Sequence, residues 1–235
     1  MISVIIPALN EEKRISRAIS QFDSIDSIEI IVADGGSTDK TGQISRSLGA
    51  KVVLNSRESQ TIAKNRNLGA KAAKGDILIF CDADTRLEKP GPFLTKVASV
   101  FKDKRVVGGT PDVEVFPEER IWKDVIFHYF LNRLVRLSLL TPIPFGRGQC
   151  QIVRKSSFFE VGGYNEELIH AEDSELFRKL RKQGKIVSLP GFFVLESPRR
   201  YRKLGYLGLS YLAVKSVAAQ LLFKKKGAES WDRVD

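Results

Sequence analysis

An aspartate pair directly follows one of the apolar segments of this 235-residue chain. Asp82 and Asp84 come after Ile77–Cys81, a short run typical of a buried strand. If the extended geometry continues, carboxylates two residues apart point the same way and can share a cation or a hydroxyl-bearing ligand. Carboxylate oxygens suit Mg²⁺ or Mn²⁺ held between a protein and a diphosphate. An acidic turn at the start of a helix would contain the same residues, so the pair alone leaves both interpretations open.

Two further loops combine carboxylates with the ends of predicted strands. The first contains Pro7, Asn10 and Glu11, in a turn that supplies backbone N–H groups at a helix start. The second begins with Asp34 and Gly35, where glycine permits close approach of a ligand. An ionised Asp34 only accepts hydrogen bonds, so it can receive a ring N–H from uracil or from guanine. Helix initiation and capping explain either loop equally well.

The elements that position these loops alternate regularly over the first hundred residues. Strands are predicted at Ile2–Ile6, Ile28–Ala33, Lys51–Leu54 and Ile77–Cys81, and helices near Glu11–Phe22, Thr41–Leu48 and Ile62–Ala73. This alternation predicts an α/β fold with a parallel sheet that helices cover on both faces. Ligands of open α/β sheets bind beyond the carboxyl ends of the strands, where all three acidic loops begin.

The second half of the chain is less regular. Its predicted elements are strands at Val106–Val115 and near Cys150–Arg154, and helices at Glu118–Leu140 and Asp173–Gln183. The last helix has acidic residues in its first turn, and we expect its positive end to keep Asp173 ionised at neutral pH. We find no linker, so we predict a catalytic domain over residues 1–200, with halves 1–100 and 101–200, and an appendage at 201–235.

Composition limits the class of protein and its partners. Hydrophobic residues make up 43% of the chain and charged residues 28%, which excludes wholesale disorder. The net charge of +10 favours an anionic partner, such as a nucleic acid, an acidic membrane or a phosphorylated substrate. Cys81 and Cys150 lie among apolar residues and are expected to be packed thiols. No basic segment followed by an apolar run opens the chain, so we expect no signal peptide and a cytosolic compartment.

The three acidic loops taken together resemble a known family. Strand–PALNEE, strand–ADGGSTDKT and strand–CDADT, in this order within the first 85 residues, are similar to the nucleotide-sugar-binding half of the family 2 glycosyltransferases. Residues 63–70 and 73–76 also look like the family's connection into the Asp-x-Asp strand. The resemblance covers roughly residues 1–200. It implies the GT-A fold, a Rossmann-like, mostly parallel sheet flanked by helices, here with a C-terminal apolar and basic helical appendage.

The resemblance also implies roles for individual residues. Asp34 matches the aspartate that binds the nucleobase. Asp82 and Asp84 match the Asp-x-Asp pair of the metal site, of which the first is usually near the ribose or donor sugar and the second at the Mn²⁺ or Mg²⁺ ion of the diphosphate. The implied donor-binding set is Pro7, Asn10, Glu11, Asp34, Gly35, Arg66, Asp82, Gly148, Arg199 and Arg200. Glu172 and Asp173 match the family's Glu-Asp motif, whose aspartate is the catalytic base. Transfer of a glycosyl group needs such a base for the acceptor's proton and positive charge at the departing diphosphate.

The chain also departs from the family pattern. The Gln-x-x-Arg-Trp motif of processive members is absent, and residues 197–202 are the nearest match, which favours transfer of a single sugar. Arg199 and Arg200 could neutralise the diphosphate or form a basic surface beside a membrane. No histidine follows His170, so metal binding would rest on Asp84, the diphosphate and water.

Two apolar segments suggest a membrane surface. Leu204–Phe223 has 14 apolar residues in 20 with one charge, Lys215, and three lysines follow it. This composition favours a helix that lies in the interface of an anionic membrane over one that spans it. Ile121–Leu140 is a second candidate. A core or oligomer-interface helix is the alternative for both segments; it is nearly as good an interpretation for Ile121–Leu140, whereas the membrane surface is favoured for Leu204–Phe223.

The sequence therefore predicts an inverting, metal-dependent glycosyltransferase that moves one sugar from a nucleoside-diphosphate sugar to a glycan or lipid-linked acceptor. We expect it to be cytoplasmic and peripheral at the cytoplasmic face of the membrane. One alternative is a nucleotidyltransferase that releases pyrophosphate. A basic nucleic-acid-binding module is another, but no recognised nucleic-acid motif is present, so we expect no nucleic-acid partner.

Overall fold

Strands from both halves of the chain form one eight-stranded sheet in the computed structural model, which describes residues 1–23, 25–168, 170–206 and 208. Neighbouring strands follow the order β3-β2-β1-β4-β7-β6-β8-β5. Six strands run in one direction, and β7 and β5 run the opposite way. The bounds are Ile2–Ala8 (β1), Ile28–Asp34 (β2), Lys51–Leu54 (β3), Ile77–Cys81 (β4), Arg86–Leu87 (β5), Val106–Val115 (β6), Cys150–Arg154 (β7) and Lys185–Glu196 (β8). The predicted α/β fold with a mostly parallel sheet is confirmed.

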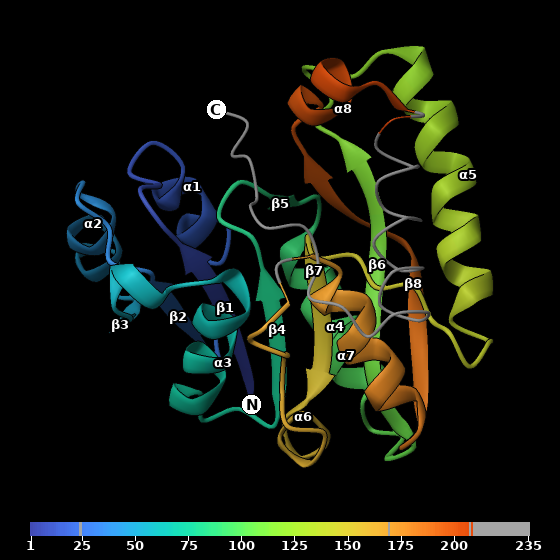
Figure 1. Cartoon of the computed structure of the whole chain (residues 1–235), viewed down its shortest axis with the longest axis horizontal. Coiled ribbons are helices and arrows are strands. Elements are labelled where there is room, and N and C mark those ends of the chain that lie inside the picture. The colour runs from blue at the N-terminus through green and yellow to red at the C-terminus, as the bar shows by residue number, and fades with distance from the viewer. Residues whose placement is uncertain (24, 169, 207, 209–235) are drawn as a thin grey trace.

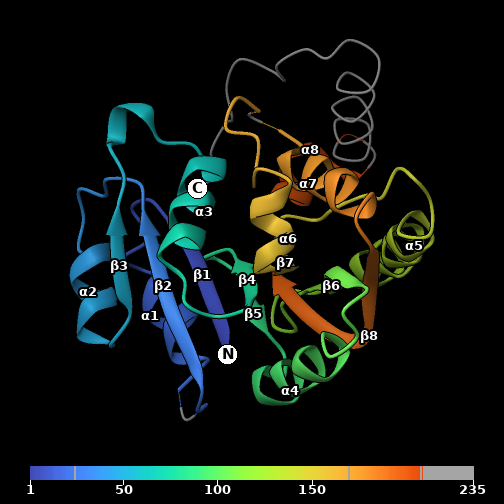
Figure 2. The same cartoon turned by 90° about the horizontal axis from the view of Figure 1, so that it is seen from below.

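Helices pack on both faces of this sheet (Figures 1 and 2). They are α1 (Ile15–Ser20), α2 (Thr41–Ser47), α3 (Ile62–Ala72), α4 (Pro90–Val100), α5 (Trp122–Ser138), α6 (Lys155–Glu160), α7 (Glu172–Arg181) and α8 (Arg199–Leu204). Successive side chains of a strand point to opposite faces. Val4 and Ile6 of β1 therefore join the core with α1 and α4, whereas Ile5 joins the core with α3, α6 and α7.

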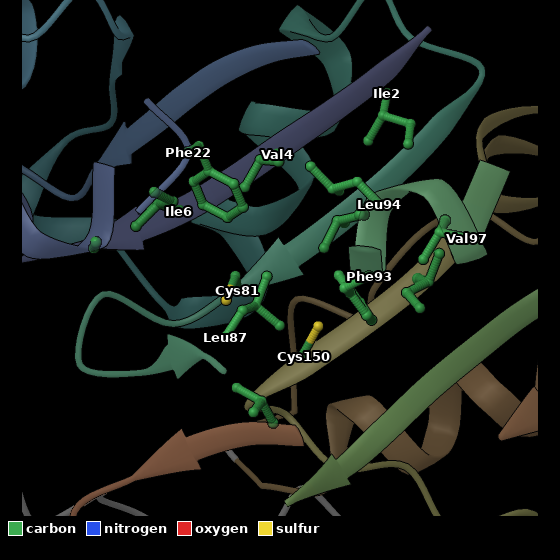
Figure 3. Packing of buried hydrophobic residues seen from close by; sticks show 14 of the residues in the cluster. Ile2, Val4, Ile6, Phe22, Cys81, Leu87, Phe93, Leu94, Val97 and Cys150 are labelled. Atoms are coloured by element: carbon green, nitrogen blue, oxygen red, sulfur yellow. The ribbon is translucent and has the colours of Figure 1, made fainter. Parts of the chain in front are cut away.

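The two cysteines meet in the first of these cores. Cys81 of β4 and Cys150 of β7 are opposite one another in the antiparallel register, and both are buried free thiols. Figure 3 shows them beside Leu87 and Phe93 of the same cluster. The prediction of two packed thiols is confirmed.

The predicted elements are all present, but several helices differ in length. The helix predicted from Glu11 begins only at Ile15, because Asn10 takes a left-handed conformation (φ 53°) and a turn follows it. Helix α5 is shorter than predicted at both ends. No helix within the described ranges is long and apolar enough to cross a bilayer.

Other elements of the second half were not predicted. Strand β8 contains Pro190 and Gly191, which interrupt its apolar pattern, and its pairing with β6 is irregular at Pro111. Helix α4 begins at Pro90, where the first turn tolerates a residue without an N–H group. The appendage predicted to form an interfacial helix lies outside the described residues, apart from its start in α8, Gly205, Tyr206 and Gly208.

Candidate active site

The parallel strands bring the candidate residues to one edge of the sheet. The loops after β1, β2, β4 and β8 all begin at carboxyl ends that point the same way, and β7 starts at this edge because it runs antiparallel. The carbonyl oxygen of Gln149, just before β7, accepts a hydrogen bond from the backbone N–H of Asp82 (3.3 Å). Segments that are far apart in the sequence therefore form one site.

Side-chain hydrogen bonds join the loops after β1 and β2. The Asn10 backbone N–H donates to Ser37 Oγ (2.9 Å), and Asn10 Oδ1 accepts from the Thr38 backbone N–H (2.9 Å). The Glu11 backbone N–H donates to Thr41 Oγ1 (2.8 Å). Pro7 lies just before these contacts as a buried residue of β1. The loops thus support each other, which is a structural role that capping alone did not predict.

Asp34 is buried at the end of β2 and holds its own loop. Its Oδ1 accepts hydrogen bonds from the backbone N–H groups of Gly36 (3.1 Å) and Ser37 (2.8 Å). A β-carbon at Gly35 would lie 2.7 Å from Asn65 Nδ2 and 2.9 Å from Gln60 Oε1, so a larger residue would have to displace these two side chains. Binding of a nucleobase by Asp34 stays a prediction. The other carboxylate oxygen, Oδ2, would make that contact.

Arg66 of α3 links the candidate carboxylates to one another. Its side chain is only 1% exposed. Nη1 donates to Glu172 Oε1 (3.0 Å), and Nη2 donates to Asp82 Oδ1 (2.8 Å) and to the Gly148 carbonyl oxygen (2.9 Å). The guanidinium also lies over the ring of Tyr164, 5.3 Å from its centre. Arg66, predicted in the donor-binding set, therefore makes its hydrogen bonds with the protein's own groups.

Asp173 lies in the first turn of α7, beside Gly148. A β-carbon at Gly148 would be 3.2 Å from Arg66 Nη2 and 3.4 Å from Asp173 Oδ2, so Gly148 lies against both side chains. Burial and the charge of Glu172 raise the pKa of Asp173 to about 7, against the opposing charge of Arg66. At neutral pH this carboxyl is therefore only about half ionised, less than the helix start alone predicts, because burial opposes the helix dipole.

Helix α7 begins one residue earlier than predicted, at Glu172, and its N-terminal flanking residue Ala171 is left-handed (φ 55°). A left-handed alanine is uncommon and costs free energy. Here it turns the chain so that Glu172 points to Arg66 while Asp173 lies beside Gly148. The backbone therefore separates the directions of two consecutive carboxylates.

The aspartate pair lies in a turn rather than on an extended strand. Strand β4 ends at Cys81, and Thr85 closes the turn by donating from its backbone N–H to the Asp82 carbonyl oxygen (3.1 Å). Asp82 points to Arg66, whereas Asp84 is exposed. Burial raises the pKa of Asp82 to about 6, with a further contribution from the charge of Asp84 and against the charge of Arg66. The two carboxylates therefore interact, although the extended geometry that would point both the same way does not continue beyond Cys81.

Asp84 lines a strongly basic pocket of about 290 Å³. The lining residues are Lys13, Arg14, Arg17, Ala83, Asp84, Thr85, Phe116, Glu119, Ser197 and Arg199. The first three lie in or beside α1, at the end of the loop that contains Glu11, and no sequence motif singles them out. Four cations and two carboxylates around one hollow favour an anionic ligand.

The two predicted arginines of α8 lie close to Asp84. Arg199 lines the same pocket and donates from Nε to Ser197 Oγ (3.2 Å). Burial lowers the pKa of Arg200, while the charges of Glu196 and Asp84 raise it. The structure thus brings both arginines to the aspartate pair across more than a hundred residues of sequence.

Glu196, at the end of β8, is a buried carboxylate that sequence reasoning missed. It accepts hydrogen bonds from Arg147 Nη2 (3.3 Å), from Gln149 Nε2 (2.7 Å) and from the hydroxyl of Tyr201. Burial raises the pKa of Glu196 to about 7, although Arg147 opposes this shift. Its only sequence signal was a carboxylate at the end of an apolar segment, in a strand that was itself not predicted.

A divalent cation fits this site if a ligand brings further oxygens. The charge of Asp84 raises the pKa of both Asp82 and Glu196, and a bound cation would relieve this repulsion. In the part of the chain that the structure describes, no three His, Cys, Asp or Glu side chains form a metal-binding group. Asp84 would therefore hold the cation together with a diphosphate and water.

Solved structures share this fold. The mannosyltransferase PcManGT from Pyrobaculum calidifontis, in complex with GDP-Man and Mn²⁺, matches 97% of this chain and 65% of its own, with a TM-score of 0.73 and 20% identity. S. aureus TarS matches 94% of this chain and 40% of its own, with a TM-score of 0.65 and 21% identity. Both likenesses support the GT-A fold.

Curated relatives match parts of the sequence. A 4,4'-diaponeurosporenoate glycosyltransferase of Staphylococcus haemolyticus is 42% identical over 92 residues, which cover 37% of this chain and 24% of the relative. The succinoglycan biosynthesis protein ExoA of Rhizobium meliloti is 27% identical over 203 residues, 77% of this chain and 58% of the relative. The chain thus spans less than two thirds of the length of these relatives. The family model for glycosyl transferase family 2 matches residues 3–162, more than half of the chain. The chain therefore belongs to glycosyl transferase family 2.

Proposed function

We propose that this glycosyltransferase transfers one sugar, with inversion, from a nucleoside-diphosphate sugar to an acceptor hydroxyl. The observation that carries the proposal is the position of Arg66, which joins Asp82 to Glu172 and to the loop at Gly148. The buried guanidinium of Arg66 thereby holds both Asp82, which we assign to the donor side, and Glu172, which we assign to the acceptor side. Inversion needs a single displacement and therefore one base.

Asp173 is the base in this proposal. Its carboxylate lies beside Gly148, and its pKa of about 7 means that about half of it is ionised at neutral pH and that it is basic enough to accept a proton. As the acceptor oxygen attacks the anomeric carbon, its proton passes to Asp173 and the bond to the diphosphate breaks. Glu172, bound to Arg66, fixes the start of α7 and so positions Asp173.

We assign the departing diphosphate to the basic pocket at Asp84. Arg14, Arg17 and Arg199 line it and can offset the negative charge that develops on the leaving group. A bound Mn²⁺ or Mg²⁺ would supply further positive charge there. Arg200 lies close enough to Asp84 to share this role.

We assign the nucleoside to the joined loops after β1 and β2. We assign Asp34 to the base, with Gly35 leaving room beside it, and Pro7, Asn10 and Glu11 to the border of the base and ribose. Support comes from the neighbours that were solved with nucleotide ligands, GDP-Man in PcManGT and UDP-GlcNAc in TarS. Asp34 alone does not choose between uracil and guanine.

For the acceptor, we propose a lipid-linked molecule at the cytoplasmic face of the membrane, with the enzyme bound peripherally. One relative is named as a 4,4'-diaponeurosporenoate glycosyltransferase. The apolar run that begins at Leu204, followed by three lysines, supports contact with an anionic surface. We place the catalytic domain at residues 1–200 and the membrane-facing appendage at 201–235.

The test is incubation of the full chain with UDP-, GDP- and dTDP-sugars and Mn²⁺. Thermal stabilisation identifies the donor, since ligand binding raises the apparent stability by mass action. Release of nucleoside diphosphate supports the proposal, and release of pyrophosphate would show a nucleotidyltransferase instead. Binding of nucleic acid in a gel shift, without any stabilisation by a nucleotide sugar, would favour the binding-module alternative.

A further inference from the structure

Helix α5 has its apolar side turned away from the protein. Its exposed side chains are mostly large and hydrophobic, and we call the following set the outer face of α5: Trp122, Val125, Ile126, Tyr129, Phe130, Leu134 and Leu137. Phe130, Leu134 and Leu137 are each more than 60% exposed. An amphipathic helix of a soluble domain normally presents the opposite arrangement. Figures 1 and 2 show α5 at one end of the molecule, with β3 at the other.

The inner side of the same helix is polar. Asp124, His128 and Asn132, spaced four residues apart, are all buried. Asp124 is bound by Arg202 of α8, and Asn132 Oδ1 accepts hydrogen bonds from the Val113 backbone N–H (3.1 Å) and from Arg147 Nη1 (3.0 Å). Val135 is buried on the same side. The polar contacts of Asp124 and Asn132 thus help to hold α5 with its apolar outer face turned away from the protein.

The outer face also carries positive charge. The Arg133 guanidinium lies 3.9 Å from the centre of the Tyr129 ring, and the Lys123 ammonium lies 5.6 Å from that of Trp122. The one acidic residue of the helix, Asp124, is fully buried. Aromatic and aliphatic side chains interleaved with cations match the boundary between the acyl chains and the headgroups of an anionic bilayer.

We propose that the outer face of α5 docks the protein on an anionic lipid bilayer. The inference deepens the proposed function, on which it rests for the lipid-linked acceptor. The distribution of charge favours a bilayer over the two other candidates for this face, which are the remaining tail of this chain and a second copy of the protein. The apolar part of the remaining chain, residues 209–223, contains one lysine and no acidic residue, so the stretch that could cover an apolar face has no counter-charge for Lys123 or Arg133. The acidic residues of the tail, Glu229, Asp232 and Asp235, come only after three further lysines. A twofold dimer through this face would bring the cations of both copies into one interface, in which α5 offers no exposed carboxylate.

This docking surface is connected to the active site through Asn132. Asn132 Oδ1, on the inner side of α5, accepts a hydrogen bond from Arg147 Nη1 (3.0 Å). The other terminal nitrogen of Arg147, Nη2, donates to Glu196 Oε1 (3.3 Å). Arg147 belongs to the loop that contains Gly148, beside Asp173. A bilayer that contacts the outer face therefore lies against the helix whose Asn132 holds the loop of Arg147 and Gly148.

Flotation with vesicles tests the proposal, using the full chain without donor. Vesicles contain phosphatidylcholine alone or mixed equally with phosphatidylglycerol. We expect the wild type to bind the mixed vesicles, and the variant Phe130→Glu/Leu134→Glu to partition at least about tenfold less, because two apolar groups become charged. The matched control is Leu54→Glu on β3, because Leu54 is as exposed as Leu134, at 63% each.

A second variant keeps the test independent of the apolar substitutions. Lys123→Gln/Arg133→Gln should lower partitioning onto mixed vesicles by roughly 30-fold and leave binding to pure phosphatidylcholine unchanged. The proposal is overturned if the full chain ignores mixed vesicles, or if Leu221→Glu/Leu222→Glu abolishes binding while both α5 variants retain it. A wild-type dimer that the Phe130→Glu/Leu134→Glu variant converts to a monomer, without vesicle binding, would assign the face to a second copy. Donor-dependent release of nucleoside diphosphate is measured separately, so its failure would count against the proposed function alone.

Discussion

Replacement of Arg66 by methionine should damage stability and catalysis in a pH-dependent way. The substitution keeps an apolar side chain against Tyr164 but removes the cation between Asp82 and Glu172. These carboxylates would then be left without their common partner in a site that is largely buried. Loss of one partner of a buried ion pair costs about 3–5 kcal/mol. For a chain of this length, about 2–4 °C of melting temperature corresponds to each kcal/mol, so the loss should be about 6–20 °C near pH 8.

The sign of the pH dependence follows from the electrostatics. Arg66 lowers the pKa of both Asp82 and Asp173, so both values rise further in the variant. Below about pH 5 these carboxyls are protonated in the folded variant, and the missing cation matters less. The difference in melting temperature between wild type and variant should therefore shrink on acidification. The acidic limb of the pH–rate profile should move to higher pH, because Asp173 must lose its proton to act as base.

Thermal unfolding at several pH values and a pH profile of nucleoside diphosphate release measure these effects. Lys71→Met, an exposed position on the same helix, is the matched control for loss of one positive charge. Arg66→Lys should recover part of the stability, since an ammonium keeps the charge but does not reproduce the forked geometry. A loss of stability that is equal at pH 5 and pH 8, with an unshifted rate profile, would refute the electrostatic role of Arg66.

Three other substitutions test the remaining parts of the site. Asp84→Asn should remove the Mn²⁺-dependent part of nucleotide affinity, and calorimetry that shows unchanged metal-dependent binding would exclude Asp84 as the metal ligand. Asp173→Asn should leave donor binding near normal and lower turnover by about 10²-fold or more, the usual scale for a lost general base, so wild-type turnover would exclude it from the mechanism. The pKa of Glu196 is raised to about 7 in the folded chain. Between about pH 5 and about pH 7 this carboxyl therefore holds more protons in the folded than in the unfolded chain. As a result, it makes the wild type less stable as the pH rises through this range. Glu196→Gln should flatten that decline in melting temperature, and an unchanged slope would contradict the shifted pKa.

Short-range patterns were enough for the sheet of the nucleotide half. Strands β1 to β4 were predicted because β-branched runs end in polar or glycine-containing turns, and a parallel arrangement then brings Asp34 and Asp82 to one edge. The family was predicted from the same three loops, and the match of residues 3–162 confirms it. These features depend on neighbours in the sequence, which is why they can be found without a structure.

Packing between distant segments decided the rest. The pairing of Arg66 with Glu172 spans 106 positions, and no local pattern distinguishes an arginine that binds a donor from one that holds two carboxylates. Burial, which raises the pKa of Asp173 to about 7, is likewise a property of the assembled site. In α5 the apolar period alone would have placed Phe130 and Leu134 inside, but Asp124, His128 and Asn132 face the protein, where Arg202, Arg147 and the backbone of β6 bind two of them. Sequence thus determined the strands, the loops and the family, whereas only the tertiary structure decided which charges meet and which side of a helix is outside.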